Sequence, residues 1–303
     1  MKVLITGSSG QLGRTLNLLK PENIEILNTT KETFDLNNDV NISKYIKKND
    51  PDWIINCGAY THVDNAEKDK DIVFQVNSKS VKTISNTLLK MKGKLLQIST
   101  DFVFDGNKNN PYKPYEKTSP INTYGYSKML AEDYIKEIII EPNKAVILRT
   151  SWLMSHFGNN FALKMLNLHK KNKKLNVVTD QIGSPTSTFT LAKICWEIIL
   201  SPFKWKDLAK ENSLILHACD SGIASWYDVA ESLGEIGEEL GLIDRKAEVK
   251  PIKSEQYFTL AKRPIFSALE SDYTFDILNL KSKHWRNSMI EFLKLVDPQK
   301  LQI

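Results

Sequence analysis

Tyr124 and Lys128 are the two side chains whose types and spacing point most directly to chemistry. They are four residues apart, so on a helix they share one face. An ammonium beside a phenol stabilises the phenolate, and the spacing therefore predicts a tyrosine pKa below its ordinary value of about 10. Such a tyrosine can donate or accept a proton near neutral pH. The pair is a candidate general acid or base.

A helix must hold this pair. Asn122 and Thr123 can cap its N-terminus, and apolar residues then recur at helical spacing as far as Ile138. Tyr126 lies two residues beyond Tyr124 and is predicted to face elsewhere. A tyrosine and a lysine at this spacing also occur on ordinary amphipathic helices. The pair gains weight from the stretches that would surround it.

The start of the chain has the layout of a dinucleotide-binding turn. Residues 2–6 form an apolar strand, a helix is predicted from Thr15 onward, and between them lie Gly7, Gly10 and Gly13. In such a turn the first glycine permits a tight bend, the second lets backbone approach a pyrophosphate, and the third lets helix and strand pack closely. A simple loop is the alternative, but the strand–turn–helix context favours a dinucleotide.

The end of the second predicted strand, residues 24–27, bears on which nicotinamide nucleotide is favoured. NAD-binding folds often place an acidic residue there to hold the ribose 2′-hydroxyl. Here Asn28 and two threonines are followed by Lys31. A lysine and hydroxyls suit a 2′-phosphate, so the sequence favours NADPH over NADH.

Two further strands are predicted to bring side chains to the same place. The strand over 53–57 runs into a small-residue turn that contains Tyr60, and the strand over 94–99 delivers Thr100 at its carboxyl end. Ligands of open α/β sheets bind at the carboxyl ends of strands. Thr100, Tyr60 and Tyr124 are therefore predicted to converge.

Composition bounds the class of protein. The chain has 303 residues, 41% of them hydrophobic, which suffices for one large α/β domain or two smaller ones. No apolar run is long enough to span a membrane and no signal-peptide layout opens the chain, so we expect a cytoplasmic protein without a membrane partner. Three widely spaced cysteines predict reduced thiols. Five scattered histidines predict no metal site.

The net charge of +5 raises the question of nucleic acid. The basic stretch 170–174 holds four lysines. No aromatic interleaving or nucleic-acid motif accompanies it, so we expect a solvated helix end and no nucleic-acid partner. A mildly positive protein still suits an anionic substrate.

With these stretches placed, the chain resembles the extended short-chain dehydrogenase/reductases, and within them the dTDP-4-dehydrorhamnose reductase family. The superfamily features are the three-glycine turn, Thr100 after its strand, and Tyr124 with Lys128. The similarity runs through nearly the whole chain. The narrower resemblance is carried by Gly-Gln-Leu-Gly at 10–13, Ala-Tyr-Thr-His-Val-Asp at 59–64, Ser-Thr-Asp-Phe-Val-Phe-Asp-Gly at 99–106, Arg-Thr-Ser-Trp at 149–152, Asp-Gln-Ile-Gly-Ser-Pro-Thr at 180–186 and Ala-Lys-Arg-Pro at 261–264.

The resemblance implies a fold and an activity. The fold is α/β, with a Rossmann-type, doubly wound parallel sheet and a smaller C-terminal substrate domain. The NAD(P)H-binding domain would comprise residues 1–150 and about 186–218. The sugar-nucleotide domain would comprise about 151–185 and 219–303. The implied reaction reduces the C4 ketone of dTDP-4-dehydro-L-rhamnose to dTDP-L-rhamnose, a step of deoxysugar and cell-surface polysaccharide biosynthesis.

The resemblance also implies roles for single residues. Tyr124 would donate a proton to the developing alkoxide, Lys128 would lower the tyrosine's pKa and hold the nicotinamide ribose, and Thr100 would hydrogen-bond the same oxygen. The expected substrate-binding residues are Thr100, Asp101, Phe102, Trp152 and Arg263. The expected cofactor-binding residues are Gly7, Gly10, Gln11, Leu12, Gly13, Asn28, Lys31, Asp35, Leu36, Ala59, Tyr60, Thr61, Asn77, Tyr124 and Lys128.

Alternatives remain open for two of these residues: Trp152 suits a core position as well as a substrate wall, and Arg263 suits a surface beside Pro264 as well as a diphosphate. Phe102 stands where related dehydratases carry a glutamate, which favours simple ketone reduction. Some family members carry a glutamate, linked to a metal-mediated dimer, where this chain has Thr15. No metal is therefore carried over, and a homodimer stays an open expectation.

Two other functions fit the same pattern. One is reduction of another nucleotide 4-keto-6-deoxy sugar. The other is a non-catalytic role, because a regulatory subunit of methionine adenosyltransferase shares this fold and many of these runs. The presence of Thr100, Tyr124 and Lys128 favours an enzyme.

Overall fold

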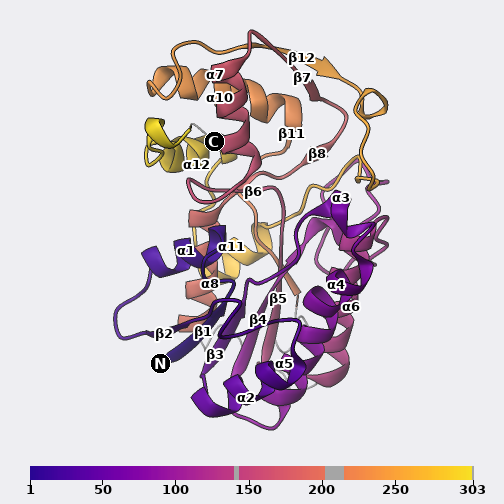
Figure 1. The fold of residues 1–303 in the computed structure, drawn as a ribbon, viewed down its shortest axis with the longest axis vertical. Helices are drawn as coiled ribbons and strands as arrows, with labels where there is room; N and C mark the ends of the chain where they lie inside the picture. Colours follow the sequence, from indigo (N-terminus) through magenta and orange to yellow (C-terminus); the bar gives the residue numbers. More distant parts are fainter. Residues whose placement is uncertain (140–142, 202–214, 302–303) are drawn as a thin grey trace.

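The computed structural model describes residues 1–139, 143–201 and 215–301, and a six-stranded parallel sheet forms the lower half of the molecule in Figure 1. Every strand pairs in parallel with its neighbours. In spatial order the strands are β10 (Ile215–His217), β5 (Ala145–Thr150), β4 (Lys94–Thr100), β3 (Trp53–Asn56), β1 (Lys2–Thr6) and β2 (Glu25–Asn28).

Helices cover both faces of this sheet. The helices α1 (Gln11–Leu18), α8 (Thr188–Leu200) and α11 (Asp272–Leu278) pack on one face, in a core shared with Val3 and Ile5. On the other face, Leu4 shares a core with α2 (Asp39–Asn49), α5 (Ser80–Leu89) and α6 (Thr123–Ile138). Two covered faces explain why the strands read as continuous apolar runs. The predicted doubly wound Rossmann-type class is confirmed.

The strand order reverses between β1 and β3, and this switch point places the ligand crevice of such a sheet. The glycine turn follows β1, and the turn at 58–62 follows β3. A continuous helical stretch in three parts follows, with a π-helical turn in the middle. They are α4 (Lys70–Phe74), the π-helix Gln75–Lys79 and α5, and the short helix α3 (Val63–Ala66) precedes them.

The upper half of the molecule in Figure 1 has its own apolar core. This core lies among the helices α7 (Phe161–Lys171), α10 (Trp226–Glu239) and α12 (Trp285–Leu293). Side-chain caps at Asn160 and Ser225 fix the starts of α7 and α10. This half also contains three two-stranded sheets: β6 (Leu153–Met154) with β9 (Thr186–Ser187), β7 (Lys174–Val178) with β12 (Glu248–Ile252), and β8 (Ile182–Gly183) with β11 (Ala224–Ser225).

Several smaller expectations can be compared with the structure. Lys170 and Lys171 form the exposed end of α7, whereas Lys174 begins β7. The three cysteines are free thiols. Among the helices of the described residues, none has the length and apolar character needed to cross a membrane.

Candidate active site

The start of α6 places Tyr124 against the end of β4. The side chain of Asn122 caps the helix by accepting from the Gly125 N–H at 2.7 Å. Gly125 has no room for a side chain, because a Cβ there would lie 2.1 Å from the Phe102 carbonyl oxygen. This close approach brings the Tyr124 ring edge-on to Phe102, with centroids 5.9 Å apart. Tyr126 is 48% exposed and turns away, as predicted.

Thr100 and Asp101, at the end of β4, form a small buried cluster. The Thr100 hydroxyl donates to Asp101 Oδ1 at 3.0 Å and accepts from the Phe102 N–H at 3.2 Å. Ser267 donates to Asp101 Oδ2 at 2.6 Å. Burial raises the Asp101 pKa to about 7, against the hydrogen bonds from Ser267 and Thr100. Asp101, expected to contact substrate, directs both carboxylate oxygens at protein hydroxyls.

The predicted direction of the Tyr124 pKa is wrong for this structure. Burial raises the Tyr124 pKa to about 12; a hydrogen bond with Thr100 lowers it and the Asp101 charge raises it. Desolvation of the phenolate outweighs any benefit from the lysine on the same helical face. Tyr124 is therefore a phenol, and a proton donor, at neutral pH.

Lys128, one helical turn after Tyr124, is buried, with 4% of its surface exposed. Its Nζ donates to the Ile98 carbonyl oxygen at 2.7 Å, two strand residues before Thr100. Burial lowers the Lys128 pKa to about 8, while the charges of Glu132 and Cys57 raise it. An ammonium of this pKa is mostly protonated at neutral pH.

The glycine turn forms a cradle that suits a dinucleotide. Gly7 has φ +62°, and a Cβ at Gly13 would lie 2.5 Å from the Gly7 carbonyl oxygen. Leu12 is buried below the turn, and Gln11 Oε1 is buried without a hydrogen-bond partner. Glycines that leave the main chain of this turn open to a ligand fit the pyrophosphate end of a nicotinamide nucleotide.

Thr15 occupies the position where some family members carry a glutamate. Its hydroxyl donates to the Gln11 carbonyl at 3.0 Å and shares a 2.9 Å hydrogen bond with Thr188. The side chain is fully buried between α1 and α8. Among the described residues, no group of three or more histidine, cysteine or acidic side chains is placed to hold a metal ion.

The turn after β3 is fixed by Asn77. Its Oδ1 accepts from the Tyr60 N–H at 2.8 Å, while its Nδ2 donates to the Tyr60 carbonyl and to the Ser127 hydroxyl. These contacts occupy the amide, so Asn77 acts on the site by positioning this turn. The Tyr60 hydroxyl donates to Asp69 at 2.6 Å, and no described hydrogen bond joins Tyr60 to Thr100 or Tyr124. The convergence of Tyr60 with that pair stays a prediction.

The remaining expected cofactor residues line the rim of the crevice. Leu36 packs on Gly58, with its side chain 2.8 Å from where a Cβ would lie. Asp35 accepts from the Asn37 N–H at 3.0 Å. Ala59 is half-buried and Thr61 is exposed.

A hollow of about 580 Å³ lies between the glycine turn and the end of β2. The Arg14 guanidinium lies in it, 3.9 Å above the Phe157 ring, and Asn28 exchanges hydrogen bonds of 2.7 and 2.9 Å with Asn17. Lys31 is exposed and does not line this hollow. Sequence reasoning missed Arg14, although a cation one residue after the third glycine was a visible signal. The lining residues are Ser8, Ser9, Arg14, Asn17, Leu18, Asn28 and Phe157.

Trp152 and Arg263 are the two expected substrate residues that the resemblance placed after residue 150. Trp152 adopts a left-handed φ of +45° and stacks on Trp226, with centroids 3.5 Å apart and planes 2° from parallel. Arg263 pairs with Asp64 at 2.8 Å, and its Nη1 is buried without a partner. Arg263 also lines a hollow of about 730 Å³ beside the Phe-Asp-Gly run.

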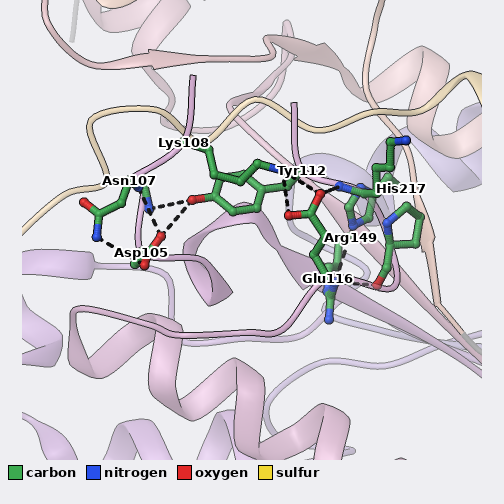
Figure 2. A network of polar contacts seen from close by, with 10 residues as sticks. Asp105, Asn107, Lys108, Tyr112, Glu116, Arg149 and His217 are labelled. Atoms are coloured by element: carbon green, nitrogen blue, oxygen red, sulfur yellow. Dashed lines mark hydrogen bonds and ion pairs between the residues drawn. The ribbon is translucent and has the colours of Figure 1, made fainter. Parts of the chain in front are cut away.

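A buried polar network behind the site was not predicted as functional. Its core is Glu132, four residues beyond Lys128, which binds Arg149 of β5 through two hydrogen bonds. In Figure 2, Arg149 lies beside His217, and the Tyr112 hydroxyl donates to Asp105, which also accepts from the Asn107 N–H. The spacing of 124, 128 and 132 on one helical face was the signal that sequence reasoning left unused.

The comparisons with known proteins agree with this geometry. A protein-family pattern described as RmlD substrate binding domain matches residues 1–297. A dTDP-4-dehydrorhamnose reductase of Sinorhizobium fredii is 33% identical, over 95% of both chains.

Two solved structures are also similar. A dTDP-4-dehydrorhamnose reductase of Clostridium acetobutylicum has a TM-score of 0.86 and 34% identity, and covers 97% of this chain and 99% of its own. A Bacillus anthracis dTDP-4-dehydrorhamnose reductase in complex with NADP has a TM-score of 0.86 and 31% identity, over 96% and 98%. Because the family pattern matches almost its whole length, the chain belongs to the RmlD substrate binding domain family.

Proposed function

We propose that this protein is an NADPH-dependent reductase that converts the C4 ketone of dTDP-4-dehydro-L-rhamnose into the alcohol of dTDP-L-rhamnose. The observation that carries the proposal is the meeting of Thr100, Tyr124 and Lys128 at the end of β4, beside the switch-point crevice. Relatives that bear this activity in their names, one of them solved with NADP, support it.

The residues divide the chemistry as follows. NADPH, when bound, supplies the hydride. Tyr124, protonated at neutral pH because its pKa is about 12, donates its proton to the oxygen that becomes the hydroxyl. The Lys128 ammonium lies on the same helical face and stabilises the phenolate that remains. Thr100 orients the reacting oxygen with its hydroxyl.

The cofactor is proposed to lie along the glycine turn. Gly7, Gly10 and Gly13 let the main chain of the turn approach the pyrophosphate closely. The hollow beside Arg14 is open to the 2′-phosphate of NADPH, and no carboxylate lines it. A cation without competing acids favours NADPH over NADH.

We propose that residues 1–150 and about 186–218 bind the cofactor, and that about 151–185 and 219–303 hold the sugar nucleotide. Residues 140–142, 202–214, 302 and 303 of these ranges lie outside the described residues. Trp152 is proposed as a wall of the sugar pocket, and Arg263 as a contact of the diphosphate through its unpartnered Nη1. The three free thiols fit the reducing cytoplasm.

A product assay tests the proposal. Purified protein, NADPH and dTDP-4-dehydro-L-rhamnose are expected to give one mole of oxidised cofactor per mole of dTDP-L-rhamnose, with Tyr124→Phe as the inactive control. Parallel reactions with other dTDP-4-keto-6-deoxy sugars identify a different sugar specificity. Water release from dTDP-glucose at constant NADPH would instead show a dehydratase. If no ketone is reduced and the protein binds methionine adenosyltransferase, the regulatory role is correct.

A further inference from the structure

Strand β4 and helix α6 are held together residue by residue. The Ile98 carbonyl accepts from Lys128 at 2.7 Å, and the next residue, Ser99, donates to Glu132 Oε1 at 2.5 Å. The third, Thr100, lies beside the proposed catalytic phenol. The helix residues 124, 128 and 132 recur every four positions, so one face of α6 makes all three contacts.

The Glu132 carboxylate contacts two neighbouring strands, β4 through Ser99 and β5 through Arg149. The carboxylate is fully buried and receives Arg149 Nε at 2.9 Å and Arg149 Nη2 at 2.6 Å. Ser99 and Arg149 are direct partners across β4 and β5. A bidentate Arg–carboxylate pair fixes both distance and angle. The end of β4 therefore cannot shift along α6 without breaking this pair.

Arg149 is held from its other side as well. Its Nη1 donates to the Pro114 carbonyl at 3.2 Å and lies 3.4 Å from His217 Nε2, so all three guanidinium nitrogens have partners. The guanidinium carbon lies 5.0 Å above the Phe104 ring. Burial and the charge of Arg149 hold the His217 pKa well below its usual range, so the imidazole is neutral. Figure 2 shows Arg149 and His217 together.

Stability alone is a poor explanation for this ion pair. Replacing a buried ion pair by apolar side chains is often neutral or stabilising, because desolvation offsets the attraction between the charges. The placement of the pair suggests a different role. Glu132 and Cys57 are the two ionisable groups whose charges raise the Lys128 pKa against its burial, and Glu132 is the larger influence.

We propose that Glu132, clamped by Arg149 and Ser99, is a positioning residue that keeps Lys128 a cation in register with Thr100 and Tyr124. The inference rests on the proposed function, because it takes Lys128 and Tyr124 as the catalytic pair. The inference adds Glu132, one helical turn after Lys128, as a residue that acts through Lys128 and touches neither substrate nor cofactor.

The test measures Lys128 directly. In protein labelled with ¹³C at lysine Cε, the Lys128 signal is assigned by its absence from Lys128→Met and titrated by NMR without cofactor. Glu132→Gln is expected to lower the Lys128 pKa by about one unit. The alkaline fall in the rate of ketone reduction should move to lower pH by the same amount. Glu132→Asp keeps the charge and should stay close to the unmodified protein.

Two further variants keep the outcome decisive. Glu235→Gln removes a carboxylate of α10, far from the site, that pairs with Arg286 of α12. This variant should leave the Lys128 titration unchanged. If Glu132→Gln does not fold, Glu132→Gln with Arg149→Met leaves no unpaired buried charge. It should still lower the Lys128 pKa, but by less than one unit, because the Arg149 cation, which disfavours a second cation nearby, is removed as well.

A folded variant without the Glu132 charge whose Lys128 pKa is unchanged would overturn the inference. If the protein reduces no ketone, the proposed function fails while the NMR titration still decides whether Glu132 controls the charge of Lys128.

Discussion

At the residue scale, the hydroxyl of Tyr124 is the group on which the proposed chemistry depends. Tyr124→Phe removes that hydroxyl and keeps the ring that packs edge-on against Phe102. The rate of ketone reduction is expected to fall by about 10²–10⁴, the usual effect of losing a general acid. Steady-state rates check this expectation, and NADPH titration of the same variant should show an almost unchanged dissociation constant. Near-normal turnover would remove Tyr124 from the mechanism.

A second residue-scale prediction concerns cofactor choice. Arg14 lines the hollow at the end of β2, whereas Lys31 does not. Arg14→Ala should therefore weaken NADPH binding by about 1–3 kcal/mol, the effect of one charge-assisted hydrogen bond, and leave NADH binding nearly unchanged. Titration of both nucleotides into Arg14→Ala and into the matched variant Lys31→Ala measures the two ratios. If only Lys31→Ala changes the ratio, the earlier assignment to Lys31 is correct.

The sequence predicted which residues share the helical face, but it did not predict their pKa values. Spacing alone placed Tyr124 and Lys128 on one helical face, since helical geometry is local. It gave the wrong direction for the Tyr124 pKa, because burial depends on elements distant in sequence. The same limit hid Ser267, which donates to Asp101 from 166 residues away.

At the element scale, the contact of α6 with the end of β4 depends on Gly125. A Cβ there would lie 2.1 Å from the Phe102 carbonyl oxygen, which is backbone and cannot turn aside. Gly125→Ala should therefore push the helix start away and destabilise the protein by about 1–3 kcal/mol, as overpacking does. Ketone reduction should fall as well, because Tyr124 is the adjacent residue. Urea unfolding and steady-state rates measure both effects, with Glu137→Ala, exposed on the same helix, as the control.

Most helices and strands could be predicted from the sequence, whereas local irregularities in the backbone could not. Continuous apolar runs, glycines and caps predicted the strands β1, β3, β4 and β5 and the helix α8, because these signals are local. The π-helical turn Gln75–Lys79 and the left-handed Trp152 left no local mark. Trp152 takes that backbone conformation where its ring stacks on Trp226, a partner that chain folding supplies.

At the scale of the whole molecule, few contacts join the segment 261–267 to the sheet half of the protein. Asn122 donates to the Lys262 carbonyl at 2.8 Å, Arg263 pairs with Asp64 at 2.8 Å, and Ser267 donates to Asp101. Asn122 caps α6 and Asp101 follows β4, whereas Asp64 lies in α3. Two of the three contacts therefore lie next to the proposed catalytic residues Tyr124 and Thr100, so a change there couples the two halves.

Asp101 makes this coupling depend on pH. Its pKa is about 7 in the folded protein and 3.8 in the absence of structure, mainly because of burial. Between these values the folded state binds more protons than the unfolded state, so the free energy of unfolding should fall as pH rises from about 4 to 7. Asp101→Asn removes the titration while its amide can still bond to Thr100 and Ser267. The variant should lose part of this slope.

Urea unfolding at a series of pH values measures the slope for the unmodified protein, for Asp101→Asn and for the exposed control Asp71→Asn. Some slope should remain in Asp101→Asn, because burial also raises the Asp220 pKa, to about 6, with the same sign. The slope of Asp71→Asn should match that of the unmodified protein. Equal slopes in all three would mean that Asp101 keeps an ordinary pKa, and that Ser267, Thr100 and the backbone N–H groups stabilise its charge as well as water does.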